Sequence, residues 1–210
     1  MKKYYIFDFD GTLVDSMPCW SNKMLNILNK SKVNYPNDII TTIATLGDNA
    51  SIDYFINVLG VGFDRQLMLN MMDQYALPKY RDEILLKEHV KSKLIQLYKQ
   101  GHSLNVLTAS PHKMLDPCLR RNGIYDLFDN VWSTDDFCLT KSNPEIYLKA
   151  LELLSCNICD AIFVDDNPIA IDTANRAGLF TVGVYDETGK DFESLLKSNS
   201  NKFIYSFKDL

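Results

Sequence analysis

Hydrophobic positions along this chain follow two patterns that alternate. Four short apolar runs indicate buried strands, at 4–7, 104–107, 161–164 and 179–184. Two weaker runs, around 131–132 and at 203–205, indicate further strands. Elsewhere apolar residues recur at helical spacing, as in the stretch 90–100, which ends at Gly101. Strands that alternate with helices in this way predict a parallel α/β sheet with right-handed connections.

The segment from about residue 15 to residue 86 carries only the helical pattern. Its apolar residues recur in three sets, at 20–28, 52–59 and 67–75. The second set is followed by Gly60, and the third helix is predicted to end before Pro78. The stretch 46–51 combines glycine with polar side chains between two helices, so it is either a solvated loop or a turn that faces a site.

These patterns predict two domains. An α/β core comprises residues 1–15 and 87–210, and a small α-helical domain comprises residues 16–86. The predicted fold class is therefore α/β, a Rossmann-like parallel sheet with a helical domain inserted directly after the first strand. In such open sheets, ligands bind at the carboxyl ends of the strands.

Composition narrows the classes of function. The chain has 210 residues, of which 46% are hydrophobic, enough for a sizeable core. A formal net charge of −5 argues against nucleic acid or an anionic membrane as a main partner. The five cysteines, an odd count, are typical of reduced thiols in a cytoplasmic protein. The apolar run after Lys3 is too short for a signal peptide, and no stretch reaches the roughly 18 apolar residues of a membrane span.

Candidate chemistry begins directly after the first strand. Asp8 and Asp10 stand two positions apart, so in an extended chain both carboxylates point to the same side. Gly11 permits a sharp turn or the close approach of a ligand, and the Thr12 hydroxyl can fix that turn. A solvated Asp-Gly turn would explain the glycine alone. Two acids close behind a buried strand favour a reaction site.

The next core strand ends in Thr108, Ala109 and Ser110, and Pro111 marks a helix start. Hydroxyls and free backbone N–H groups beside a helix N-terminus suit an anion, although an ordinary helix cap explains them equally well.

Further polar residues follow later in the core. Lys141 precedes a helix start at Asn143, and taken alone it would be a solvated surface lysine. Asp165 and Asp166 end the strand 161–164. They form either a surface turn or a cation site, since adjacent buried acids repel each other without a cation.

The string from Asp8 to Thr12, behind an apolar strand, resembles the first motif of the haloacid dehalogenase-like superfamily. The resemblance implies that Asp8 is a nucleophile that forms an aspartyl-phosphate and that Asp10 is a general acid and base. The dehalogenases of the superfamily lack the second Asp, so Asp10 argues for phosphoryl transfer.

The resemblance extends to the later motifs. Thr108 corresponds to the hydroxyl residue that binds phosphate, and Lys141 to the lysine that neutralises charge shared by nucleophile and phosphate. The family usually has proline directly after this lysine, where this chain has Ser142. The pair Asp165 and Asp166 is similar to the acidic pair that supplies carboxylates to Mg²⁺ in the β-phosphoglucomutase-like branch.

The helical insert resembles the cap of the branch that includes β-phosphoglucomutase and phosphoglycolate phosphatase. In that branch a cap turn selects the substrate, which implies this role for Asp48 and Asn49.

Together these features predict a Mg²⁺-dependent phosphatase that acts on a small phosphorylated metabolite. The expected Mg²⁺ ligands are the Asp8 carboxylate, the Asp10 carbonyl and the pair Asp165 and Asp166. The expected contacts to phosphate are Gly11, Thr108, Ala109, Ser110 and Lys141. Two alternatives stay open: a sugar-phosphate mutase with the same nucleophile, and a non-catalytic binding or regulatory protein on this fold. The sequence does not set the oligomeric state and is compatible with a monomer.

Overall fold

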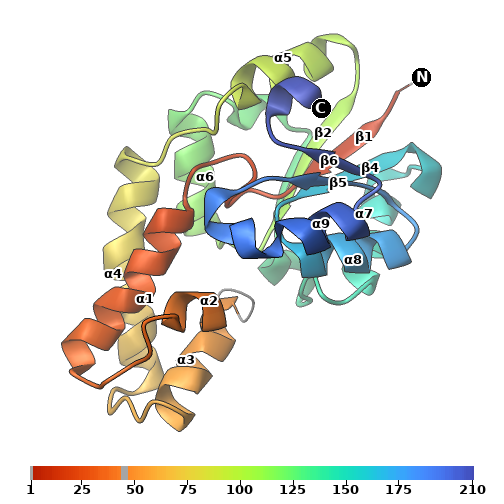
Figure 1. Ribbon diagram of the computed structural model, residues 1–210. Helices are drawn as coiled ribbons and strands as arrows, with labels where there is room; N and C mark the ends of the chain where they lie inside the picture. The colour runs from red at the N-terminus through yellow and green to blue at the C-terminus, as the bar shows by residue number, and fades with distance from the viewer. Residues whose placement is uncertain (1, 44–46) are drawn as a thin grey trace. The chain divides into compact units, whose positions relative to one another are not determined.

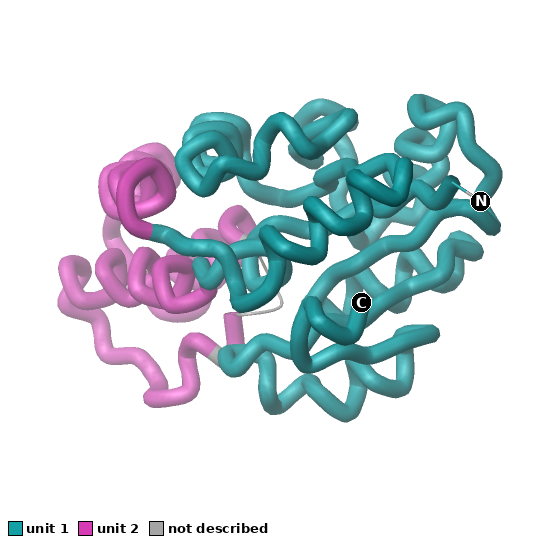
Figure 2. The backbone as a smooth tube through the Cα atoms, turned by 90° about the horizontal axis from the view of Figure 1, so that it is seen from above, with its two compact units in different colours: residues 1–16, 84–210 teal, residues 17–83 magenta. Residues whose placement is uncertain are grey.

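A computed structural model describes residues 2–43 and 47–210 of the chain (Figure 1). The chain divides into two compact units (Figure 2). The first, called the core unit below, comprises Met1–Ser16 and Ile84–Leu210, and the second, the helical unit, comprises Met17–Glu83.

The core unit is built on one parallel sheet. Its six strands lie in the order β3-β2-β1-β4-β5-β6, and every neighbouring pair is parallel. The strands are β1 (Tyr4–Phe7), β2 (Ser103–Thr108), β3 (Asn130–Ser133), β4 (Ala161–Asp165), β5 (Phe180–Val184) and β6 (Lys202–Ile204). The predicted α/β fold class is confirmed.

The register of the strands aligns the carboxyl ends of β1, β2 and β4, where the polar residues lie. Phe7, the last residue of β1, pairs with Val106 of β2 and with Val164 of β4. The Asp8 N–H donates to the Val164 carbonyl at 2.8 Å, so Asp8 stands beside Asp165. The carboxyl ends of the three central strands therefore meet at one edge of the sheet, as ligand sites of open α/β sheets require.

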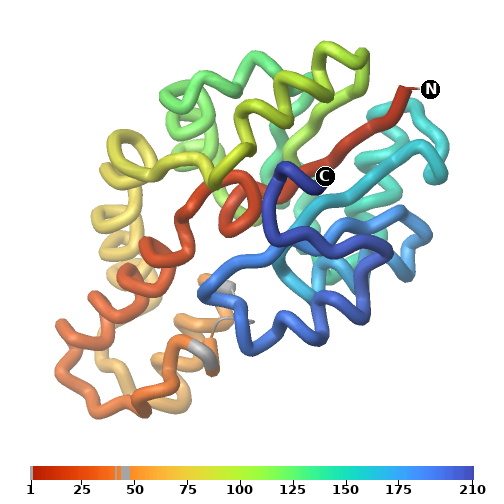
Figure 3. Tube along the Cα trace, turned by 45° about the horizontal axis from the view of Figure 1, so that its top comes forward, coloured from red at the N-terminus to blue at the C-terminus, as the bar shows by residue number. Residues whose placement is uncertain are grey.

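Helices cover both faces of this sheet (Figures 1 and 3). One face carries α5 (Val90–Lys99) and α6 (His112–Arg121), and the other carries α7 (Glu145–Leu154), α8 (Pro168–Arg176) and α9 (Glu193–Asn199). Short 3-10 turns complete the unit at Tyr125–Leu127, Thr134–Phe137, Ile158–Asp160, Glu187–Phe192 and Phe207–Asp209.

The core beneath α7 and α8 centres on Tyr147, whose side chain is wholly buried. The Tyr147 ring packs edge-on against Phe163 of β4, with 5.0 Å between centroids. Its hydroxyl lies 2.8 Å from the Lys141 carbonyl and 3.1 Å from the Ala170 carbonyl. Tyr147 therefore fastens the loop that carries Lys141 to the core.

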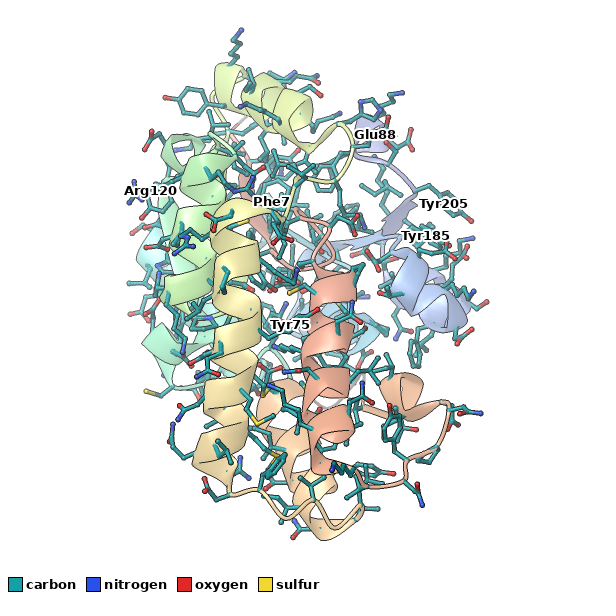
Figure 4. The ribbon with its side chains drawn as sticks, turned by 90° about the vertical axis from the view of Figure 1, so that its left-hand side faces the viewer. Phe7, Tyr75, Glu88, Arg120, Tyr185 and Tyr205 are labelled. Carbon is teal, nitrogen blue, oxygen red and sulfur yellow. The ribbon has the colours of Figure 1, made fainter. Side chains whose placement is uncertain are left out.

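The helical unit consists, over its described residues, of four helices and no strand. These are α1 (Met17–Ser31), α2 (Ile39–Ile43), α3 (Gly47–Asn57) and α4 (Arg65–Asp82). Within the unit α1 packs along α4, which carries Tyr75 (Figure 4). A core of its own holds the unit together, with Met24, Phe55 and Met68 fully buried. This explains the methionine-rich helical spacing, because flexible Met side chains fill the gaps between helices.

Two sequence predictions about this unit were wrong. The stretch 47–51 is the start of α3 rather than a turn, with Leu46 outside the described residues. An acid in the first helical turn is stabilising, and Asp48 occupies that place. The last helix does not end before Pro78 but continues through it to Asp82. The proline removes one backbone hydrogen bond, and buried Ala76 and Tyr80 on either side offset that loss by packing.

The buried hydroxyl of Tyr147 yields a stability prediction. We expect Tyr147→Phe to lower the free energy of unfolding by about 1–3 kcal/mol, because buried carbonyls lose their donor. Urea denaturation measures the loss. The same change at exposed Tyr98 serves as the control and should leave the midpoint unchanged. Equal effects of the two substitutions would contradict the structural role of this hydroxyl.

Candidate active site

Three carboxylates gather at the carboxyl edge of the sheet. Asp8 follows β1, Asp165 ends β4 and Asp166 comes next. One oxygen from each lies within 4.8 Å of the others. Asp8 and Asp165 are buried and Asp166 is partly buried. Since like charges at this separation repel strongly in a poorly solvated site, the cluster needs positive charge.

Lys141 supplies one positive charge. Its ammonium lies 2.7 Å from Asp8 Oδ1 and 2.7 Å from Asp165 Oδ2. The other oxygen of Asp165 accepts a hydrogen bond from the Asn167 N–H at 2.7 Å. Lys141 donates a hydrogen bond to Asp165 Oδ2, whereas Asp8 Oδ1, although close to the same ammonium, is buried without a well-formed hydrogen bond among the described residues.

Burial and charge together shift the protonation of the cluster. Burial most of all, and the charge of Asp165 in addition, raise the pKa of Asp8 to about 7, against the lowering effect of Lys141. Burial also raises the pKa of Asp166, as do the charges of Asp165 and Asp8. For Lys141, burial lowers the pKa, but the two neighbouring carboxylates raise it by more, so the amine stays charged. One ammonium therefore does not compensate the whole cluster.

The turn after β1 is fitted against Asp166. Gly11 has a φ of +71°, and a Cβ at this position would lie 2.5 Å from Asp166 Oδ2. The Thr12 hydroxyl donates to Asp166 Oδ1 at 2.7 Å. Glycine is therefore required both by the left-handed backbone and by the carboxylate beside it.

Asp10 is held by two serines. The Ser16 hydroxyl donates to Asp10 Oδ1 at 2.6 Å, and the Ser110 hydroxyl donates to Asp10 Oδ2. Ser110 was predicted to contact phosphate, and the structure places its hydroxyl on the predicted general acid. Sequence reasoning missed Ser16, because its contact arises only when the turn folds back on itself.

The remaining predicted site residues lie in both units. Thr108 is buried at the end of β2, and its hydroxyl oxygen accepts from the Ser110 N–H at 3.1 Å, while Ala109 is exposed. In the helical unit, Asp48 accepts from Trp20 Nε1 at 3.0 Å and pairs with Lys23 at 2.7 Å. The neighbouring Asn49 accepts from Arg65 at 3.3 Å.

The acidic cluster fits a divalent cation. Carboxylate oxygens are the ligands that hard cations prefer, and three of them converge here. Asp8 Oδ1 has the Lys141 ammonium beside it but no well-formed hydrogen bond among the described residues, so it could accept a cation as a further partner. Charge balance gives a second reason, since the pKa values of two acids are raised despite Lys141.

A family model described as haloacid dehalogenase-like hydrolase matches residues 5–184. The chain belongs to this family. The match runs from the first strand to the end of β5, so it includes the acidic cluster, Lys141 and the whole helical unit. The family predicted from the motif at Asp8 is confirmed.

Similar curated proteins are phosphatases. A validoxylamine A 7'-phosphate phosphatase of Streptomyces hygroscopicus subsp. limoneus is 27% identical over 95% of this chain and 92% of its own length. A phosphoglycolate phosphatase of Psychrobacter arcticus is 27% identical over 87% of this chain and 83% of its own. Among solved structures, CbbY from Rhodobacter sphaeroides in complex with phosphate superposes with a TM-score of 0.85 at 18% identity, covering 100% of this chain and 96% of that one. At this identity the superposition shows the shared fold.

A membrane-crossing helix was not expected from the sequence. None of the described helices combines the length and the apolar character that a crossing requires.

The raised pKa of Asp8 gives a prediction for the metal-free protein. Its ordinary value is 3.8 and its value in the fold is about 7, so the folded state holds the extra proton between these limits. The stabilising effect of this proton on the folded protein is fully present below about pH 4 and is lost as the pH rises through about 7. A cation competes with this proton. We therefore expect Mg²⁺ to raise the melting temperature more at about pH 8 than at about pH 5.

Thermal melts with and without Mg²⁺ at both pH values measure this difference. Asp8→Asn is the control, because it removes the titrating carboxylate and should make the Mg²⁺ effect smaller and less pH-dependent. An equal Mg²⁺ effect at both pH values in the unmodified protein would contradict the assignment.

Proposed function

We propose that this protein is a Mg²⁺-dependent phosphatase that hydrolyses a small phosphorylated metabolite through an aspartyl-phosphate on Asp8. The observation that carries the proposal is the buried Asp8 carboxylate beside Lys141 at the carboxyl edge of the sheet. The coarser assignment, a phosphoric monoester hydrolase of this family, is supported by relatives named as phosphatases.

In the first step, a carboxylate oxygen of Asp8 attacks phosphorus, and the bond from phosphorus to the ester oxygen breaks. The Asp10 carboxyl gives its proton to the departing oxygen. Lys141 neutralises charge that passes from Asp8 to the phosphoryl group, and its position 2.7 Å from Asp8 Oδ1 suits that role. Thr108, Ala109 and the Gly11 turn are the proposed contacts to the other phosphate oxygens, while Ser110, predicted as a further contact, is proposed to hold Asp10 instead.

In the second step, Asp10 takes a proton from water, and the oxygen of that water attacks phosphorus. The bond between Asp8 and phosphorus breaks, which releases inorganic phosphate and restores the carboxylate. The two serine hydroxyls on Asp10 hold its carboxyl in a defined orientation for both transfers.

Asp8, Asp166 and the Asp10 carbonyl are the proposed principal metal ligands. When bound, Mg²⁺ would neutralise phosphate charge and align the phosphoryl group. Asp165 also belongs to the cluster. Both of its oxygens already accept hydrogen bonds, one from Lys141 and one from Asn167, so we infer that its first role is to hold Lys141.

We also infer that the helical insert, predicted as residues 16–86, acts as a cap that selects the substrate. Asp48 lies at the start of α3 with Trp20 and Lys23 on its two oxygens. Its neighbour Asn49 is exposed, and because its side-chain oxygen accepts from Arg65, its NH₂ group is the part proposed to face a substrate.

The two alternative functions, a sugar-phosphate mutase and a non-catalytic binding protein, can be distinguished by what becomes of the substrate. A mutase would return an isomer of a sugar phosphate, and a binding protein would return the ester unchanged. Incubation with a panel of phosphorylated metabolites and Mg²⁺, followed by measurement of free phosphate, tests the proposal. Phosphate release that stops in excess chelator supports it, and full release in chelator contradicts the metal assignment.

Substitutions of the two acids of the first motif are predicted to have different effects. Asp8→Asn should form no phosphoenzyme, because it lacks the nucleophile. Asp10→Asn keeps its backbone carbonyl and loses only proton transfer, so we expect a rate lower by about 10²–10⁴. That loss should be smaller for aryl phosphates with good leaving groups. Mass spectrometry after reaction with acetyl phosphate locates the phosphoryl group, and its presence on any residue other than Asp8 overturns the mechanism.

Substitutions at the start of α3 test the substrate role of the insert. We expect Asp48→Asn and Asn49→Ala to change kcat/KM for the best metabolite by more than they change it for para-nitrophenyl phosphate. Asn57→Ala is the matched control, since Asn57 is exposed at the other end of α3. An equal change for both substrates would argue against selection by this segment.

A further inference from the structure

A second lysine, outside all the recognised motifs, holds the turn that follows β1. The Lys87 ammonium donates to the Gly11 carbonyl at 2.7 Å and to the Tyr185 carbonyl at 2.7 Å. It also pairs with Asp186 Oδ2 at 3.0 Å. An ammonium group has three N–H donors, and all three have acceptors here. The Lys87 side chain is only 20% exposed, so this arrangement is mostly shielded from water.

The turn that Lys87 holds connects two groups of the proposed mechanism. Gly11 lies between Asp10 and Thr12, and the Thr12 hydroxyl donates to Asp166. On its Cα side, Gly11 packs directly against the Asp166 carboxylate. A shift of this turn would therefore move the general acid and a proposed metal ligand together.

Asp186 adds a charge to the same region. It is 8% exposed, and its other oxygen accepts from the Thr188 N–H at 3.0 Å and from the Thr188 hydroxyl. Burial, Asp165 and Asp8 raise the pKa of Asp166 most, and the charge of Asp186 adds to them. Lys87 thus neutralises a carboxylate that acts on the acidic cluster.

The backbone at Lys87 is also joined to the first motif. The Lys87 N–H donates to the Leu13 carbonyl at 3.0 Å, and the Asp15 N–H donates to the Leu85 carbonyl at 3.0 Å. Val14 and Leu86 form an antiparallel bridge between these bonds. The segment around Lys87 therefore lies in a fixed register beside residues 13–15, which brings its side chain to the Gly11 carbonyl.

We propose that Lys87 is a positioning residue for phosphoryl transfer, which fixes the Gly11 turn and thereby the places of Asp10 and Asp166. Lys87 need not touch the substrate for this role. The proposal rests on the proposed function for its kinetic part, while the link from Lys87 to the turn can be measured without turnover.

Lys87→Met removes the ammonium and keeps the length of the side chain. We expect kcat to fall by about tenfold to 10²-fold with KM changed by less than about twofold, because the reacting groups lose alignment. The loss should be larger for alkyl phosphates than for para-nitrophenyl phosphate, since poor leaving groups depend most on Asp10. A loss that is equal for both substrates would overturn the proposal, because a general loss of folded enzyme produces that result.

Hydrogen exchange followed by mass spectrometry supplies the measurement that needs no turnover. The N–H groups of Gly11, Leu13 and Val14 are hydrogen-bonded within the turn. Lys87→Met should therefore exchange faster in the peptide that spans 9–16, and unchanged exchange there would overturn the proposal. If the unmodified protein hydrolyses no phosphate ester, the proposed function fails, while faster exchange still supports the link from Lys87 to the turn.

Lys93→Met is the matched control. Lys93 of α5 also donates to backbone carbonyls, those of Lys208 and Leu210, at the C-terminal end of the chain. This variant should leave both the exchange of 9–16 and the leaving-group dependence unchanged. If Lys87→Met does not fold, Lys87→Arg is measured instead. It keeps the charge, but its planar group does not reproduce three converging bonds, so we expect a smaller effect of the same kind.

Discussion

Compensation of buried negative charge is the constraint on which the candidate active site at the carboxyl edge of the sheet depends. Three carboxylates lie close together with little access to water. An isolated ion moved from water into such surroundings loses several kcal/mol of solvation even after relaxation, so neighbouring charges must replace that solvation. Lys141 does so for Asp8 and Asp165 at once. Burial first, and then the neighbouring carboxylates, still raise the pKa values of Asp8 and Asp166, so the cluster favours further positive charge. The site is thus prepared for positive charge before any phosphate arrives.

Packing in the hydrophobic core of the core unit holds the Lys141 loop in place. Tyr147 stands on α7, packs on Phe163 of β4 and holds the carbonyl of Lys141. Strand β4 carries Asp165 at its end, so one block of packed side chains sets both the lysine and one of its acids. This arrangement matters for chemistry because a lysine at the end of a mobile loop would spend part of its time in solvent. Held by the core, it stays 2.7 Å from Asp8.

The turn that follows β1 is fixed by contacts to its backbone as well as by packing. Gly11 presses on Asp166, and the carbonyl of Gly11 accepts from Lys87. Two lysines from distant parts of the chain therefore hold one short segment: Lys141 contacts Asp8, the proposed nucleophile, and Lys87 contacts the turn that follows it. If Asp8 and Asp10 act as the proposed nucleophile and general acid, their segment gains from this double restraint, since small misplacements of reacting groups reduce rates steeply.

The sequence by itself determined the family and the fold class. That Asp8, Asp165 and Asp166 meet could be predicted, because each follows an apolar strand and parallel strands end at one edge of the sheet. Helices in the insert were also predictable, because their apolar spacing is local information. The start of α3 at Gly47 and the passage of α4 through Pro78 were not, since tertiary packing offsets weak local signals there.

Only the tertiary structure decided the partners of each polar group. Ser16 and Ser110 lie far apart in sequence and both reach Asp10. Lys87 looks like any surface lysine in the sequence, yet it meets Gly11 and Asp186 across 76 and 99 positions of the chain. Hydrogen bonds and ion pairs act over a few ångströms in space, and separation along the chain carries no record of them. The residue types that make the chemistry are thus visible in the sequence, whereas their alignment belongs to the fold.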